Sequence, residues 1–167
     1  MLKIATYFNY YQKTTRHIMS RLQAYPIEYG EDKLKFCFVS IGFAGEIVKL
    51  VSYDYYRSSL WNLSFGDAND DQTDFDYKVI SDNGDMRKVM QTVFQTSLIF
   101  TDEYPNRKIY IEPVDRKRRV LYNRILQEKQ TDIEQYFTIE GGFSNKIGNE
   151  PYNPLKMYDT FVVTRKV

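Results

Sequence analysis

The chain has 167 residues, with 23 Lys and Arg against 22 Asp and Glu and a formal net charge of +1. A chain of this length can bury about two-thirds of its unfolded surface without a disulfide or a metal ion. Its near-zero charge predicts no global field that would attract nucleic acid, an anionic membrane or acidic substrates. Because Cys37 is the one cysteine, a disulfide framework and a cysteine-based zinc site are excluded.

The chain is predicted to form a single domain, with residues 1–33 as an N-terminal arm or short helix and residues 34–167 as the core. A short helix over 15–24 is indicated by a capping threonine, an apolar face and Pro26 beyond its end. The aromatic cluster at 7–11 either packs on the sheet as an arm or docks a second subunit. We find no apolar run of signal-peptide or membrane-spanning length, which predicts a soluble cytoplasmic protein.

Strands are predicted next. Residues 35–41 and 46–53 are apolar or alternating and are separated by "GFAG", whose glycines suit a tight hairpin turn. Two further strands, 60–65 and 75–80, flank the acidic stretch "GDANDDQTD". This stretch lacks the glycine and the glutamate of a calcium-binding loop, so we predict a solvated loop and no metal site.

The apolar period changes to that of a helix at Met86. Asp82, Asn83 and Asp85 are competent helix starters, and acidic groups suit the positive end of the helix dipole. The spacing predicts one buried face. Its members are Met86, Val89, Met90, Val93, Phe94, Ser97 and Leu98.

The last third of the chain reads as strand, helix, strand, strand. The strand "RKIYIEP" ends at Pro113, and a helix over 114–129 follows. The strands "QYFTIEGG" and "MYDTFVVTRK" close the chain. The residues expected on the inner side of the helix are Val114, Leu121, Tyr122 and Ile125. These elements predict an α+β fold, with a mixed, largely antiparallel sheet and two main helices packed on it.

The order strand, glycine turn, long helix, strand, helix with Leu121-Tyr122, strand, strand over residues 75–166 resembles the C-terminal half of the Gcn5-related N-acetyltransferase fold. The resemblance implies an acetyltransferase-like scaffold in which the turn at Asn83, Gly84 and Asp85 carries a cofactor pyrophosphate on backbone amides. It also implies that Tyr122 is the acid that protonates a leaving thiolate.

This sequence departs from the acetyltransferase pattern at three places. Asp115 stands where the family has an asparagine, and Arg118 stands where it usually has a small alanine. The glycine-rich turn is reduced to Asn83-Gly84-Asp85, and the neighbouring carboxylates would repel a pyrophosphate.

A second resemblance covers most of the chain from about Phe36. The words "WNLSFGD", "ISDNGDMRKVMQTV", "EYP", "RRVLYNRI" and "YDTFVVTRK" resemble those of an uncharacterised family of short bacterial proteins, a domain of unknown function. This resemblance implies a shared fold and supplies no chemistry.

The candidate site is a crevice between the turn 81–85 and the helix start 115–122. In one interpretation Arg118, with Arg119 nearby, and the amides of Asn83 and Gly84 bind a phosphate or carboxylate, and Tyr122 serves as the acid. In the other, Arg118 forms a structural salt bridge with an aspartate. The candidate partners are Asp82, Asp85 and Asp115.

Three functions follow from these observations. The preferred one is a non-catalytic binding or interaction module on an acetyltransferase-like scaffold, without a cofactor and with a protein partner or a second copy as ligand. An acyl-CoA-dependent N-acyltransferase with a degenerate pyrophosphate turn is the first alternative, and only it requires coenzyme A. The second is a nucleic-acid or toxin-neutralising interaction protein that uses the basic run 116–119. Nucleic acid is not the expected partner of the preferred module.

Overall fold

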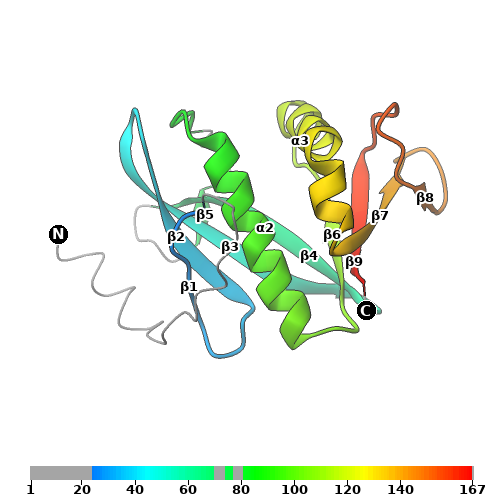
Figure 1. The fold of residues 1–167 in the computed structure, drawn as a ribbon, viewed down its shortest axis with the longest axis horizontal. Coiled ribbons are helices and arrows are strands. Elements are labelled where there is room, and N and C mark those ends of the chain that lie inside the picture. Colours follow the sequence, from blue (N-terminus) through cyan, green and yellow to red (C-terminus); the bar gives the residue numbers. More distant parts are fainter. Residues whose placement is uncertain (1–23, 70–73, 77–80, 167) are drawn as a thin grey trace. The chain divides into compact units, whose positions relative to one another are not determined.

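The computed structural model describes residues 24–69, 74–76 and 81–166. It confirms an α+β fold with a mixed, largely antiparallel sheet, and the described residues form two helices (Figure 1). Residues 1–23 lie outside the described part, and they include most of the predicted N-terminal arm and all of the predicted helix at 15–24 except Ala24. Residues 77–80, the end of a predicted strand, also lie outside it. In the described part, neither helix is both long and apolar enough to cross a membrane.

Residue contacts divide the chain into two compact units, each described by itself. Unit 1 comprises residues up to Tyr53 together with Ser64–Glu103. Unit 2 comprises Asp54–Leu63 together with Tyr104–Val167. The long strands β3 (Gly45–Arg57) and β4 (Leu60–Ala68) therefore contribute to both units.

The strands of unit 1 follow the predicted hairpin pattern. Gly42 pairs with Gly45 across the turn between β2 and β3, which confirms "GFAG" as a two-residue hairpin loop. Cys37 is buried in β2, as predicted for a small apolar residue. The strands are β1 (Glu28–Tyr29), β2 (Lys35–Gly42), β3 (Gly45–Arg57), β4 (Leu60–Ala68) and β5 (Phe75–Asp76). β1 pairs with β2, β2 with β3 and β4 with β5, and all three pairings are antiparallel.

Helix α2 (Met86–Glu103) covers one face of β2 and β3 (Figure 1). Aromatic rings form much of the contact: Tyr53 of β3 stacks on Phe100 of α2 with ring centroids 4.1 Å apart, and Phe36 meets Tyr53 edge-on. Such rings bury a large apolar area per residue. They therefore supply much of the packing between α2 and the sheet.

The buried face of α2 differs in part from the predicted one. Val89, Val93 and Ser97 are buried as expected, but Met90, Phe94 and Leu98 are only partly buried. Threonines replace them on the inner face at positions 92, 96 and 101. Their hydroxyls bond to carbonyls one turn earlier in the helix, which removes the cost of burying them.

Unit 2 has the strand order β4-β6-β9-β7-β8, with β4 and β6 parallel and the other pairs antiparallel. Its strands beyond β4 are β6 (Lys108–Ile111), β7 (Phe137–Gly142), β8 (Asn149–Pro151) and β9 (Thr160–Arg165). Helix α3 (Arg116–Glu134) lies against β7 (Figure 1). The short strands β1 and β8 were not predicted.

Helix α3 is longer than predicted and turned differently about its axis. Asn123 and Leu126 are its buried residues, whereas Val114 lies before its first turn and is 64% exposed. The prediction that Val114 belongs to the inner face is therefore wrong. The helix begins after the cap at Asp115, and Pro113 and Val114 precede it in the connection from β6.

Candidate functional site

Asn83 ties the predicted cofactor turn to the tip of the β2–β3 hairpin. Its side chain is buried, and its Oδ1 accepts a hydrogen bond from the Ala44 amide at 2.7 Å. Its Nδ2 donates to Ser40 Oγ at 2.9 Å and to the Gly45 carbonyl at 3.1 Å. Its backbone carbonyl accepts from the Phe43 amide at 3.0 Å. Both the side chain and the main chain of Asn83 therefore hold the turn against the β2–β3 hairpin.

Gly84 is exposed and lies next to the same hairpin tip. It has a φ of +77°, a conformation that favours glycine. The Phe43 ring lies so close that a Cβ on Gly84 would overlap it, although Phe43 itself is 93% exposed. Gly42 permits the approach, because a Cβ there would overlap the Asn83 carbonyl. The hairpin tip therefore occupies one side of the turn.

Asp85 is the last residue before α2, and its carboxylate accepts hydrogen bonds from two hydroxyl groups. Tyr25 Oη and Ser40 Oγ each donate to its Oδ2 at 2.6 Å. Its backbone carbonyl accepts from the amides of Lys88 and Val89 and so starts the helix. Burial, and then the bond to Asp85, raise the pKa of the Tyr25 hydroxyl. Tyr25 therefore stays protonated and remains a donor to this carboxylate at neutral pH.

A buried ion pair lies under the start of the same turn. Lys49 of β3 and Asp67 of β4 are 6% and 7% exposed and form a salt bridge. Lys49 Nζ also donates to Ser81 Oγ at 2.5 Å. The sequence analysis missed this group, but the signal is present: Lys49 interrupts the apolar run "IVKLVSY" at a position that shares a sheet face with Val51.

The two predicted arginines are held in ion pairs within unit 2. Arg118 pairs with Asp115, whose carboxylate also caps α3 by accepting from the Arg118 amide at 2.8 Å. Arg119 Nη1 lies 2.9 Å from Asp159 Oδ1. Asp159 also accepts from the backbone amide and hydroxyl of Ser144. Of the two interpretations of Arg118, this geometry provides the structural salt bridge, with Asp115 as the partner.

Tyr122 lies one turn after Arg118 on α3. Burial raises the pKa of its hydroxyl to about 12, with Asp115 adding to the shift and Arg118 opposing it. The group therefore holds its proton throughout the neutral range. A general acid works best when its pKa lies near the working pH, so this environment makes Tyr122 a weaker acid than free tyrosine.

Asn123, beside Tyr122, connects α3 to the backbone of Tyr158. Its Nδ2 donates to the Tyr158 carbonyl and its Oδ1 accepts from the Tyr158 amide, both at 2.9 Å. Tyr158 is fully buried, and its hydroxyl donates to Glu150 Oε1 at 2.8 Å. The sequence analysis missed Asn123. A polar side chain in phase with Leu126 on a helix was the available signal.

The predicted site residues fall into two groups in different units. Asn83, Gly84 and Asp85 belong to unit 1, and Arg118, Arg119 and Tyr122 belong to unit 2. Each group is held by partners within its own unit. Among the described residues, no group of three or more His, Cys, Asp and Glu side chains could hold a metal ion.

A comparison with known protein families supports the resemblance to an uncharacterised family. The family of unknown function DUF6934 matches residues 21–166 of this chain. The chain belongs to the DUF6934 family. Comparison with curated proteins and with solved structures gave no significant match.

Two aspartates of unit 2 in this DUF6934 protein, Asp115 and Asp159, accept hydrogen bonds from backbone amides and predict a loss of stability in acid. Hydrogen bonds from the amides of Arg118 and Ser144, respectively, lower the pKa values of Asp115 and Asp159 from the ordinary 3.8. A lowered folded-state pKa contributes stability that is complete above the unfolded-state pKa and is lost as the pH falls through the folded-state pKa. We therefore expect the destabilisation caused by Asp115→Asn to shrink as the pH falls below 3.8. Urea unfolding at several pH values between neutral and acid would measure it.

An unchanged difference between the wild type and Asp115→Asn across that pH range would contradict this prediction. Asp132→Asn is the matched control, because Asp132 is an exposed aspartate on the same helix whose ion pair with Lys129 is long, at 3.6 Å. An exposed pair of this kind contributes little stability. The control variant should therefore follow the wild type at every pH.

Proposed function

We propose that this DUF6934 protein is a non-catalytic binding module on an acetyltransferase-like scaffold. The order α2, β6, α3, β7, β9 follows the order expected from the resemblance, which supports the scaffold. The observation that carries the proposal is the occupied turn: the β2–β3 hairpin tip bonds to Asn83, and the Phe43 ring lies against the exposed Gly84.

A pyrophosphate binds a helix start through open backbone amides and the positive end of the helix dipole. In this chain a phenylalanine ring lies over the glycine of the turn, and the carboxylate of Asp85 stands at the helix start. The ring hinders access, and the carboxylate repels a dianion. The hydroxyl donors of Tyr25 and Ser40 are already committed to Asp85. Together these features favour a structural tie over a ligand site.

We expect millimolar coenzyme A and acetyl-coenzyme A to leave the thermal midpoint of the wild-type chain unchanged. A ligand at a hundred times its dissociation constant would stabilise the chain by about 2.7 kcal/mol and raise the midpoint by roughly 5–10 °C. Differential scanning calorimetry would show a shift of that size. Such a shift, accompanied by acyl transfer that Tyr122→Phe slows, would replace this proposal with the N-acyltransferase.

Phe43→Ala provides the matched variant, because it removes the ring over Gly84 and keeps the Phe43 amide that bonds to Asn83. Phe43 is almost fully exposed, so its loss should have little effect on folding. Coenzyme A that stabilises Phe43→Ala but not the wild type would show that the ring alone closes the turn. If coenzyme A shifts the thermal midpoint of neither protein, the result agrees with a turn at which the carboxylates also prevent binding.

A further inference from the structure

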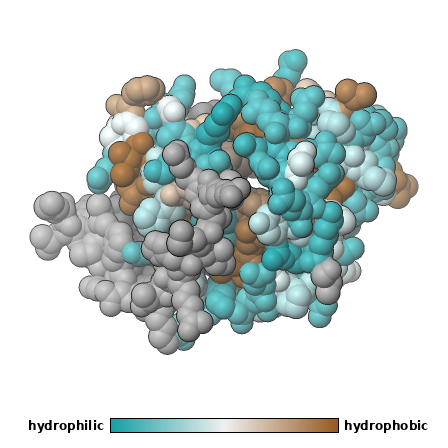
Figure 2. Space-filling view, viewed as in Figure 1, coloured by the Kyte–Doolittle hydropathy of each residue, from teal (hydrophilic) through white to brown (hydrophobic). Residues whose placement is uncertain are grey.

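Unit 2 exposes a group of aromatic and basic side chains around the turn between β3 and β4. We call this group the aromatic hairpin. Its members are Tyr55, Tyr56, Arg57, Trp61, Tyr104, Arg107, Lys108 and Tyr110. Tyr55 is 65% exposed and Tyr56 is 46% exposed. The view in Figure 2 shows a largely hydrophilic surface with separate hydrophobic patches.

The first part of the aromatic hairpin is a flat stacked pair. Tyr56 and Tyr110 lie with ring centroids 4.9 Å apart and an angle of 1° between their planes. The guanidinium of Arg57 lies 5.2 Å from the Tyr56 centroid. Tyr110 is further fixed by a hydrogen bond from its hydroxyl to Glu112 at 3.2 Å. An exposed ring is thus held rigidly by a second ring, with a cation beside it.

The second part holds a guanidinium between two rings. Trp61 and Tyr104 are parallel to within 4°, with centroids 6.5 Å apart. Arg107 lies between them, with its Cζ 3.8 Å from the Trp61 centroid and 3.5 Å from that of Tyr104. Tyr55 meets Trp61 edge-on at 5.9 Å. Tyr55 is therefore packed against Trp61 and remains 65% exposed.

The charge of the chain is unevenly divided between the units. Unit 2 contains thirteen Lys and Arg against nine Asp and Glu, a net charge of +4. The rest of the chain contains ten against thirteen, a net charge of −3. The overall value of +1 conceals this difference. A polyanion would be attracted to the unit that carries the aromatic hairpin.

We propose that the aromatic hairpin binds single-stranded nucleic acid. Tyr55 and Tyr56 follow one another in β3, so their side chains point to opposite faces of the sheet. A flexible single strand that passes around the turn between β3 and β4 stacks one unpaired base on each ring, and Arg57 and Lys108 contact its phosphates. Exposed rings combined with basic side chains bind single strands with little sequence preference, because every base has a flat face. A duplex keeps its bases stacked and cannot use the rings in this way. This inference rests on the proposed function, since it names the partner class of the binding module. It replaces the protein partner expected from the sequence, because the overall charge of +1 hides the net charge of unit 2.

The test is fluorescence anisotropy of labelled 12-nucleotide single-stranded DNA and RNA, titrated with the full chain. Tyr55→Ala and Tyr56→Ala should each weaken binding by about ten-fold. Tyr55→Phe keeps the stacking face and should bind like the wild type. Raising the salt from about 50 to 200 mM should weaken binding by roughly seven-fold if Arg57 and Lys108 contact two phosphates. Arg57→Gln should reduce this salt dependence.

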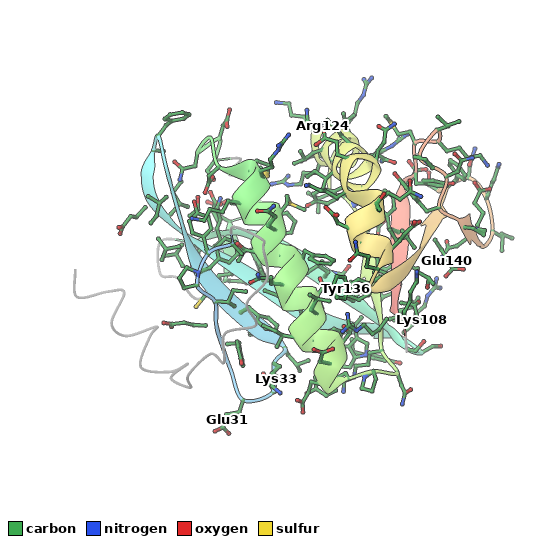
Figure 3. All side chains as sticks on the ribbon, in the orientation of Figure 1. Glu31, Lys33, Lys108, Arg124, Tyr136 and Glu140 are labelled. Atoms are coloured by element: carbon green, nitrogen blue, oxygen red, sulfur yellow. The ribbon has the colours of Figure 1, made fainter. Side chains whose placement is uncertain are left out.

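Two matched controls come from the same unit. Tyr136, 41% exposed, follows the end of α3, and Arg124 lies on α3 with an exposed side chain. Both are labelled in Figure 3. Tyr136→Ala and Arg124→Gln change a tyrosine and an arginine outside the aromatic hairpin. Binding by these variants should equal that of the wild type.

Absence of single-strand binding at low salt would overturn the inference, as would equal binding of a duplex of the same length. Equal losses in the hairpin variants and in the two controls would also overturn it, because the attraction would then be general charge. The thermal test with coenzyme A addresses the proposed function separately. A chain that binds neither coenzyme A nor single strands loses only the partner inferred here, whereas one that turns over acetyl-coenzyme A loses the proposed function.

Discussion

Replacing Asp67 with asparagine should lower the free energy of unfolding by about 3–5 kcal/mol, one of the two largest effects that we expect in this chain. The substitution leaves the ammonium of Lys49 in a buried site without its counter-charge. Removing one partner of a buried ion pair has a cost of this size. The Ser81 hydroxyl still accepts from Lys49, but a neutral acceptor does not replace a carboxylate. Urea unfolding of the purified chain would measure the loss.

The control is a double-mutant cycle with Lys49→Met and Asp67→Leu. A pair of apolar side chains needs no hydrogen bonds, so the double variant should be more stable than Asp67→Leu alone. Losses that simply add would show that the two side chains do not interact in the folded chain. Lys33→Met is a matched surface substitution, because the Lys33–Glu103 pair is partly exposed in the same unit. It should change stability by less than about 1 kcal/mol.

Replacing Asn123 with leucine should cost about 2–5 kcal/mol. The leucine has a similar size but leaves the amide and the carbonyl of Tyr158 without the partners that Asn123 provides. Each buried backbone group that loses its partner costs about 1–3 kcal/mol. Urea unfolding followed by circular dichroism would report the change.

Gln127→Leu is the control for this variant, since Gln127 is an exposed residue one turn further along α3. It should alter stability by no more than about 0.5 kcal/mol. Asn123→Asp should also be less stable than the wild type at neutral pH, because its buried carboxylate would face the Tyr158 carbonyl to which Asn123 Nδ2 donates. A wild-type stability for Asn123→Leu would show that the contact between α3 and Tyr158 does not support the fold.

Apolar periodicity in the sequence was sufficient to place the two helices and most of the strands. It located the start of α2 at Met86, and glycines placed the hairpin between β2 and β3. It did not predict correctly which residues of α2 face the core. Periodicity ranks Phe94 and Leu98 above Thr92 and Thr96 as core residues. It does not register that a threonine hydroxyl can bond within its own helix.

The candidate site shows a second limit of sequence reasoning. Asn83 and Asp85 were selected because their side chains suit a helix start, and the structure places both immediately before α2. Their partners Ser40 and Tyr25 are 43 and 60 residues away in the chain. Local patterns carry no information about such contacts. For the same reason the overall charge hid the difference between the two units.

The uneven placement of two rare residues gives each unit a natural probe. Trp61 is the one tryptophan of the chain and belongs to unit 2, where its indole ring touches Arg107. Cys37 is the one cysteine and is buried in unit 1, where burial raises the pKa of its thiol to about 12 and keeps it unreactive. Indole emission therefore follows the packing of one unit, and thiol labelling follows the opening of the other. The order in which the two units open can be read from the unmodified chain without an added dye.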